Sequence, residues 1–146
     1  MKQVILIEIN FIIPGEPKAK QRPRVCKTGH TYTPKETVQY EKLVRTCYEQ
    51  KYSNINLTGE LTINIKAYFS IPKSGTKLVK RQMLAGDIRP VKRPDWDNIG
   101  KIITDALNEV AYHDDAQIVE AIVEKYYSDN PRVEVTVKEL RGLNNE

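Results

Sequence analysis

The chain has 146 residues, of which 40% are apolar and 29% are charged, with a net charge of +4 at pH 7 and a pI near 9.0. This size suits one soluble globular domain over residues 1–146. No apolar run approaches the roughly 20 residues of a membrane span. Glu8 and Asn10 interrupt the N-terminal apolar run, which predicts a strand and not a signal peptide. Cys26 and Cys47 form no disulfide framework or zinc motif, which favours a reduced, cytoplasmic protein.

Alternating apolar and polar residues predict four strands. Residues 60–69 alternate most clearly, residues 133–139 alternate again, and residues 119–127 are rich in valine, isoleucine and tyrosine. The polar residues 140–146 are expected to form a flexible tail. The first strand covers residues 4–13, and one of its faces carries Ile5, Ile7, Ile9, Phe11 and Ile13.

Two longer segments have helical periodicity. In the first, Thr33 can cap the helix, Pro34 fits the first turn and Glu36 completes a capping box, and the helix is expected to run to about Tyr52. The second covers residues 97–110 and places an apolar stripe against a sheet. The predicted core stripe of the first helix consists of Tyr40, Leu43, Val44, Cys47 and Tyr48.

The order of these elements predicts an α/β domain, more specifically α+β. A mixed sheet of four or five strands should pack against the two main helices. A third, short basic helix is expected over residues 76–85, with Thr76 as its cap and Gly86 at its end.

Basic residues concentrate before residue 94. Residues 17–35 hold six basic residues and no acid in a stretch that predicts a long loop or loose hairpin, and residues 73–93 hold seven basic residues against Asp87. A basic surface beside an acidic pocket suits a phosphodiesterase, although a solvated charged loop is the alternative. The candidate DNA-binding residues are Lys18, Lys20, Arg22, Arg24, Lys80, Arg81, Lys92 and Arg93.

Acidic residues gather after this basic region. Asp95 and Asp97 would face together in an extended stretch, with Lys101 one helical turn beyond Asp97, and Asp114 and Asp115 follow the second helix. Carboxylates grouped in this way suit a cation, most simply Mg²⁺. Alternatively, Asp97 caps the helix and Lys101 forms an ion pair with it. A helix of about 14 residues is about 20 Å long, so spacing alone does not bring the two acid pairs together.

These motifs resemble the RusA-type Holliday junction resolvases. The resemblance rests on Asp95-Trp96-Asp97-Asn98, Lys101, Asp105-Ala106-Leu107-Asn108 and Asp114-Asp115-Ala116-Gln117, in this order. The segments Pro14-Gly15-Glu16-Pro17 and Lys20-Gln21-Arg22-Pro23-Arg24 resemble the phage and prophage branch. The chain departs from the family pattern at Trp96, where an aliphatic residue is usual, and at Pro94, where some members carry a basic residue.

The resemblance implies a small α/β homodimer that cuts four-way DNA junctions by paired incision in recombination and repair. It implies dependence on Mg²⁺, with Mn²⁺ as a substitute. It assigns catalysis to Asp95, Asp97, Asp115 and Lys101, and metal binding to the three acids and Asp114. Two alternatives stay open, a non-cleaving junction- or duplex-binding protein and a less selective nuclease acting on flaps or RNA.

Overall fold

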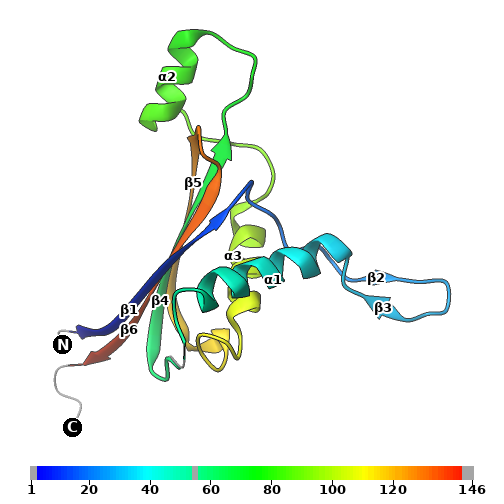
Figure 1. The fold of residues 1–146 in the computed structure, drawn as a ribbon, viewed down its shortest axis with the longest axis vertical. Helices are drawn as coiled ribbons and strands as arrows, with labels where there is room; N and C mark the ends of the chain where they lie inside the picture. Colours follow the sequence, from blue (N-terminus) through cyan, green and yellow to red (C-terminus); the bar gives the residue numbers. More distant parts are fainter. Residues whose placement is uncertain (1–2, 54–55, 143–146) are drawn as a thin grey trace.

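A computed structural model of the chain describes residues 3–53 and 56–142. Its main sheet has four strands in the order β1-β6-β4-β5 (Figure 1). Neighbours β1–β6 and β6–β4 are antiparallel, whereas β4 and β5 are parallel, which confirms the predicted mixed sheet. The strands are β1 (Gln3–Pro14), β4 (Glu60–Ser70), β5 (Ile118–Ser128) and β6 (Arg132–Gly142).

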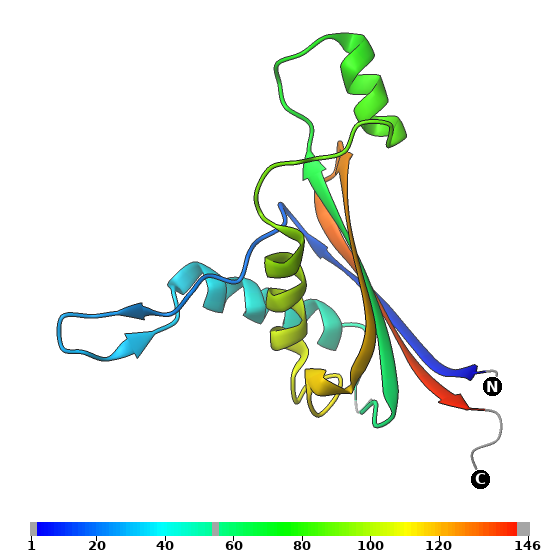
Figure 2. The same ribbon diagram turned by 180° about the vertical axis from the view of Figure 1, so that it is seen from behind.

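Two helices, α1 (Lys35–Glu49) and α3 (Trp96–Leu107), contact each other and the sheet. The third, α2 (Lys77–Ala85), lies beyond the end of the sheet and buries no residue of its own (Figures 1 and 2). As predicted, Thr76 Oγ1 accepts a hydrogen bond from Val79 N at 3.2 Å, and Gly86 ends α2 with a φ of 85°. In the described residues no helix is long and apolar enough to cross a membrane.

One hydrophobic core lies between the sheet and the two main helices. Every second residue of β4 and β6 is buried, as the alternation predicted. The other face of the sheet is polar and carries side chains such as Asn64, Lys66 and Glu134. The largest fully buried side chains include Ile9, Ile13, Leu61, Ile65, Ile99, Ile102, Ile103, Leu107 and Tyr112.

Several predicted boundaries and burials were wrong. Pro34 occupies the cap position of α1, and no side chain caps the helix, so Thr33 and Glu36 form no capping box. The regular helix ends at Glu49, three residues before the predicted end, although the amides of Gln50 and Tyr52 still donate to Thr46 O and Tyr48 O. The Tyr52 hydroxyl then donates to Asn10 O of β1 at 3.0 Å. The second main helix ends at residue 107 and not at 110. Three predicted core residues are exposed: Ile5 at 50%, Ile7 at 39% and Leu43 at 36%.

A narrow arm projects from the body at residues 18–33 (Figure 1). It contains the short antiparallel strands β2 (Arg24–Val25) and β3 (Thr31–Tyr32), which confirms the predicted loose hairpin. The predicted tail is wrong for residues 140–142, because β6 continues through them and pairs with β1. Residues 143–146 lie outside the described part of the chain.

Candidate active site

The sequence-predicted acids lie at the two ends of α3. The helix begins at Trp96, so the cap position belongs to Asp95 and not to Asp97, and no side chain caps the helix. The Asp97 carboxylate instead accepts a hydrogen bond from Asn98 N at 3.0 Å. The predicted extended stretch over both acids is wrong, because Asp95 is extended (φ −71°, ψ 152°) and Asp97 lies in the first turn of the helix.

Asp95 lies in an open hollow of about 540 Å³ beside the start of α3. The hollow is lined by Arg22 from the base of the arm, Arg93 from the connection before the helix, and Asn98 from the first turn of α3. Thus two of the predicted DNA-binding residues meet at a predicted catalytic acid. Trp96 is 64% exposed, so it serves no core role.

The base of the arm runs along the exposed side of α3. Lys20 N donates to Asn98 O at 3.1 Å, which fixes the arm to the first turn. Lys20 Nζ lies 3.1 Å from Glu41 Oε1 and 3.4 Å from Asp105 Oδ2. Lys101 Nζ lies 3.5 Å from Asp105 Oδ2, so the predicted ion pair of Lys101 with Asp97 is replaced by one with Asp105. Sequence analysis gave Asp105 no role, although its spacing of four from Lys101 was a signal.

The other predicted acids lie at the opposite end of α3, where a short 3₁₀ helix, η1 (Asp115–Gln117), follows. Asn108 Oδ1 accepts a hydrogen bond from Asp115 N at 2.9 Å. Gln117 Oε1 accepts from the amides of His113 and Asp114, both at 3.0 Å. Gln117 Nε2 donates to Leu57 O at 2.9 Å and Gly59 O at 3.2 Å.

Asn108 and Gln117 belong to the motifs that resemble the RusA family, but sequence analysis assigned them no role in positioning the acids. Together they hold the backbone that carries Asp114 and Asp115. Acid-x-x-glutamine resembles a capping box, so the spacing of Asp114 and Gln117 was the available signal.

Negative charge accumulates around Asp115. Burial raises the pKa of Asp115, a hydrogen bond with Asp114 and the charges of Asp114 and Asp105 raise it further, and Lys101 opposes them. At the other end of α3, burial lowers the pKa of Lys125, and the negative charge of Asp95 opposes that shift. Carboxylates whose negative charges repel one another, as those around Asp115 do, suit a divalent cation.

One chain does not bring the four predicted acidic ligands together. Asp95 and Asp97 lie at the start of α3, whereas η1 lies beside its end (Figure 2). A helix of 12 residues is about 18 Å long. Within residues 3–53 and 56–142, no group of three or more histidine, cysteine, aspartate and glutamate side chains could hold a metal ion.

The remaining predicted DNA-binding residues form two groups. Lys18 and Arg24 are exposed on the arm. Arg81 is exposed on α2, where Lys80 Nζ donates to Lys73 O at 2.8 Å. Lys92 lies on the connection from α2 to α3, with its Nζ 6.0 Å from the centre of the Phe69 ring. In Figure 1 the arm and α2 project from different parts of the body.

Comparison with known proteins identifies the family. Residues 14–138 match the family described as Endodeoxyribonuclease RusA. The chain belongs to the RusA family of endodeoxyribonucleases. It is also 36% identical over 137 residues to the uncharacterized protein YqaN of Bacillus subtilis (strain 168). The matched region covers 90% of this chain and 96% of that relative. The RusA match includes the arm, both acid pairs and Lys101.

Proposed function

We propose that the chain is a divalent-metal-dependent endonuclease that resolves four-way DNA junctions as a homodimer, in the cytoplasm, during recombination and repair. The observation that carries this proposal is the RusA family match over residues 14–138. The proposed catalytic residues are Asp95, Asp97, Asp115 and Lys101, with Asp114 as a further metal ligand.

The two acid pairs have donor chemistry that fits Mg²⁺, with Mn²⁺ as a substitute. Mg²⁺ prefers oxygen ligands and binds one or two carboxylates together with water and substrate phosphate oxygens. When bound, the metal lowers the pKa of a water and stabilises the leaving oxygen. Asp95 and Asp97 are exposed and thus accessible to both metal and phosphate.

A second copy of the chain supplies the acids that one chain keeps apart. Asp95 and Asp97 lie at one end of α3, and Asp114 and Asp115 lie beside the other. Within the described residues no three of these acids are grouped closely enough to hold a metal ion. A twofold dimer that places the η1 end of one copy against the start of α3 in the other would form two equivalent sites, each with acids from both copies. Two equivalent sites are the arrangement that paired cuts across a symmetric junction require.

Basic residues around Asp95 are proposed to hold the DNA. Arg22 and Arg93 line the same hollow as Asp95, where a phosphate could accept hydrogen bonds from both guanidinium groups. Lys101 would offset negative charge on the phosphoryl oxygens in the transition state. Lys20 pairs with Glu41 and Asp105, and these two carboxylates offset its charge, so it is the weakest of the candidate phosphate-binding residues. The arm, α2 and the connection from α2 to α3 extend the basic surface through Lys18, Arg24, Lys80, Arg81 and Lys92.

A junction-cleavage assay tests this proposal. Purified protein with Mg²⁺ should place symmetric nicks in a labelled four-way junction, and EDTA should abolish the nicks. Duplex, flap and RNA substrates at the same salt concentration should be cut more slowly. Equal cutting of flaps or RNA would favour the less selective nuclease.

The acid variant Asp95→Asn separates cleavage from binding. It should abolish cutting and should retain or strengthen binding, because it removes a negative charge that faces phosphate. Asp129→Asn is the matched control, since Asp129 is exposed in the turn between β5 and β6. Tight binding by the unaltered protein without nicks at any Mg²⁺ or Mn²⁺ concentration would contradict the proposal and favour a non-cleaving DNA-binding protein.

A further inference from the structure

Four side chains stack across the polar face of the sheet, and we call them the ladder: Arg132, Tyr68, Tyr126 and Arg89. The rings of Tyr68 and Tyr126 are stacked with centroids 5.6 Å apart and planes at 25°. The Arg132 guanidinium lies 4.0 Å from the centre of the Tyr68 ring, and the Arg89 guanidinium lies 4.2 Å from that of Tyr126. Each end of the tyrosine pair therefore holds one guanidinium by a cation–π contact.

The two guanidinium groups differ in their remaining hydrogen bonds. Arg132 Nε donates to Glu134 Oε2 at 2.9 Å. Its Nη1 donates to Ser128 Oγ at 3.1 Å and Asn130 O at 2.8 Å. Arg132 therefore closes the turn between β5 and β6 and has a structural role.

Arg89 uses one donor only. Its Nε donates to Lys125 O at 2.8 Å, and no hydrogen bond or ion pair engages its terminal nitrogens within the part of the chain that the structure describes. The nearby acid, Glu124, instead accepts hydrogen bonds from Tyr126 Oη at 2.6 Å and Asn64 Nδ2 at 3.3 Å. Arg89 is thus exposed, fixed in orientation, and free to offer two nitrogens on one edge of its plane.

The position of Arg89 connects it with the candidate site. It lies on the connection from α2 to α3, six residues before Asp95. This connection is fastened to the edge strand β5 twice, by Arg89 Nε on Lys125 O and by Lys125 Nζ on Lys92 O. A nucleic acid strand that enters the site at Asp95 across this edge of the sheet would meet Arg89.

We propose that Arg89 binds a backbone phosphate of the DNA strand that enters the site at Asp95, with the ladder as its support. This inference rests on the proposed function. The chemistry is that of a planar guanidinium, which can donate two parallel hydrogen bonds to one phosphate. Lysine has the same charge without the planar fork, so it cannot reproduce both the stacking and the paired donation.

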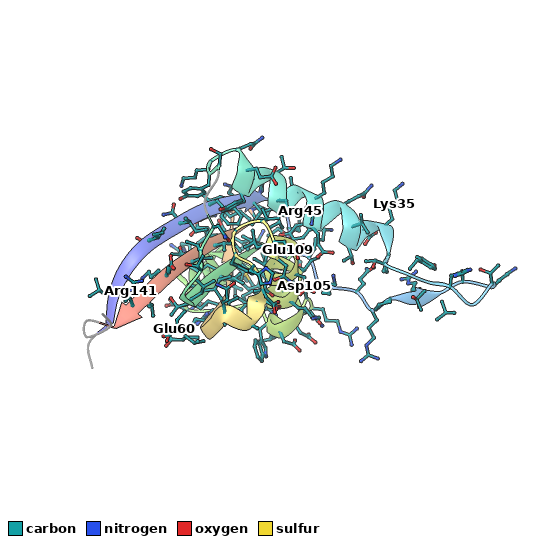
Figure 3. The ribbon with its side chains drawn as sticks, turned by 90° about the horizontal axis from the view of Figure 1, so that it is seen from below. Lys35, Arg45, Glu60, Asp105, Glu109 and Arg141 are labelled. Atoms are coloured by element: carbon teal, nitrogen blue, oxygen red, sulfur yellow. The ribbon has the colours of Figure 1, made fainter. Side chains whose placement is uncertain are left out.

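DNA binding in the non-cleaving Asp95→Asn background tests the proposal. The Kd for a synthetic four-way junction is measured against NaCl concentration for this parent and for added Arg89→Ala, Arg89→Lys or Arg141→Ala. Arg141, which is labelled in Figure 3, is the matched control, because it is exposed and β6 begins at Arg132 and ends just after Arg141. Circular dichroism melting checks that each variant is folded.

Arg89→Ala should weaken binding by about 10- to 100-fold and reduce the slope of log Kd against log salt by about one, the signature of one lost phosphate contact. Arg89→Lys should keep most of the slope and lose part of the affinity. Tyr126→Leu should weaken binding in the same direction as Arg89→Ala, because leucine removes the ring under the guanidinium. Tyr126→Phe keeps the ring but loses the hydroxyl that binds Glu124, so it should weaken binding less than Tyr126→Leu.

Equal Kd values and salt slopes for Arg89→Ala and Arg141→Ala would overturn the inference, because Arg89 would then contribute only net charge. Full recovery by Arg89→Lys together with unchanged binding by Tyr126→Leu would also overturn it. Failure of the Asp95→Asn parent to bind any DNA would contradict the proposed function and this inference with it. Normal binding by the parent with no specific effect at Arg89 would contradict this inference alone.

Discussion

The two ends of α3 hold their acids in opposite ways. At the C-terminal end, Asn108 and Gln117 bind the backbone around Asp114 and Asp115. At the N-terminal end, the Asp95 carboxylate does not cap the helix and faces an open hollow. One end is therefore fixed by the fold of the single chain, and we infer that the other is completed by metal, DNA and a second copy.

The largest expected effect comes from removing an acid at either end. Asp97→Asn and Asp115→Asn should each lower junction cleavage by about 10³-fold, because metal ions supply several kcal/mol of transition-state stabilisation. Asp115→Asn should not lower the melting temperature, since it removes one of several mutually repelling charges. Asp97→Asn should change the melting temperature little, because asparagine keeps an oxygen that can accept from Asn98 N. Single-turnover cleavage rates and thermal melting measure both properties. Asp87→Asn, at an exposed position before the site, is the control that should cut normally.

Gln117→Leu should lower the stability of the protein, because Gln117 fixes the C-terminal end of α3 by side-chain hydrogen bonds. Gln117 makes four hydrogen bonds to backbone groups, so its loss should lower the free energy of unfolding by about 2–3 kcal/mol. Cleavage should fall by about 10- to 100-fold, as is typical when the support of a metal ligand is removed. Gln39→Leu on the exposed side of α1 is the matched control. Unchanged stability to urea in Gln117→Leu would mean that this end of α3 is not fixed by its side chain.

Lys101→Met tests the exposed middle of α3. Lys101 is 60% exposed and pairs only loosely with Asp105, at 3.5 Å. The variant should leave the free energy of unfolding within about 0.5 kcal/mol of the original value. Cleavage should fall by about tenfold through the loss of one charge-assisted contact to phosphate. Lys101→Arg should recover part of the rate, and a methionine variant that cuts as fast as the original would remove Lys101 from the proposed site.

The smallest effect is expected at Glu109, just beyond α3 (Figure 3). Glu109 has a φ of 61°, in the left-handed region that disfavours residues with a side chain, and it is exposed. Glu109→Gly should raise the free energy of unfolding by about 0.5–1 kcal/mol and leave cleavage unchanged. Urea denaturation measures the gain, and a loss of stability would show that the glutamate side chain contributes more than its backbone strain costs.

The sequence alone predicted the strands of the sheet with one buried face, because such a strand alternates apolar and polar residues. Residues 60–69 and 133–139 therefore predicted β4 and β6 correctly. The hairpin arm and α2 also followed from local signals, including the Thr76 cap. The RusA resemblance predicted the family correctly from its acid and lysine spacing.

Contacts between distant segments could not be predicted in this way. The cap position of α3 lies two residues earlier than predicted, at Asp95 in place of Asp97, so Asp97 lies inside the first turn. The link from Lys20 to Glu41 and Asp105 joins the arm, α1 and α3, which have no sequence relation. The Tyr68–Tyr126 stack depends on the parallel pairing of β4 with β5, which alternation does not reveal.

Subunit mixing tests the central claim most directly, that acids from two copies form each site. Asp95→Asn and Asp115→Asn proteins, each expected to be inactive alone, are mixed under conditions that allow subunits to exchange. If the sites form across two copies, a mixed dimer has one site with both changes and one with neither, so the mixture should nick junctions at about a quarter of the original number of sites. If each site forms within one chain, every site carries a change, and a mixture that stays inactive although mixed dimers have formed would contradict the account.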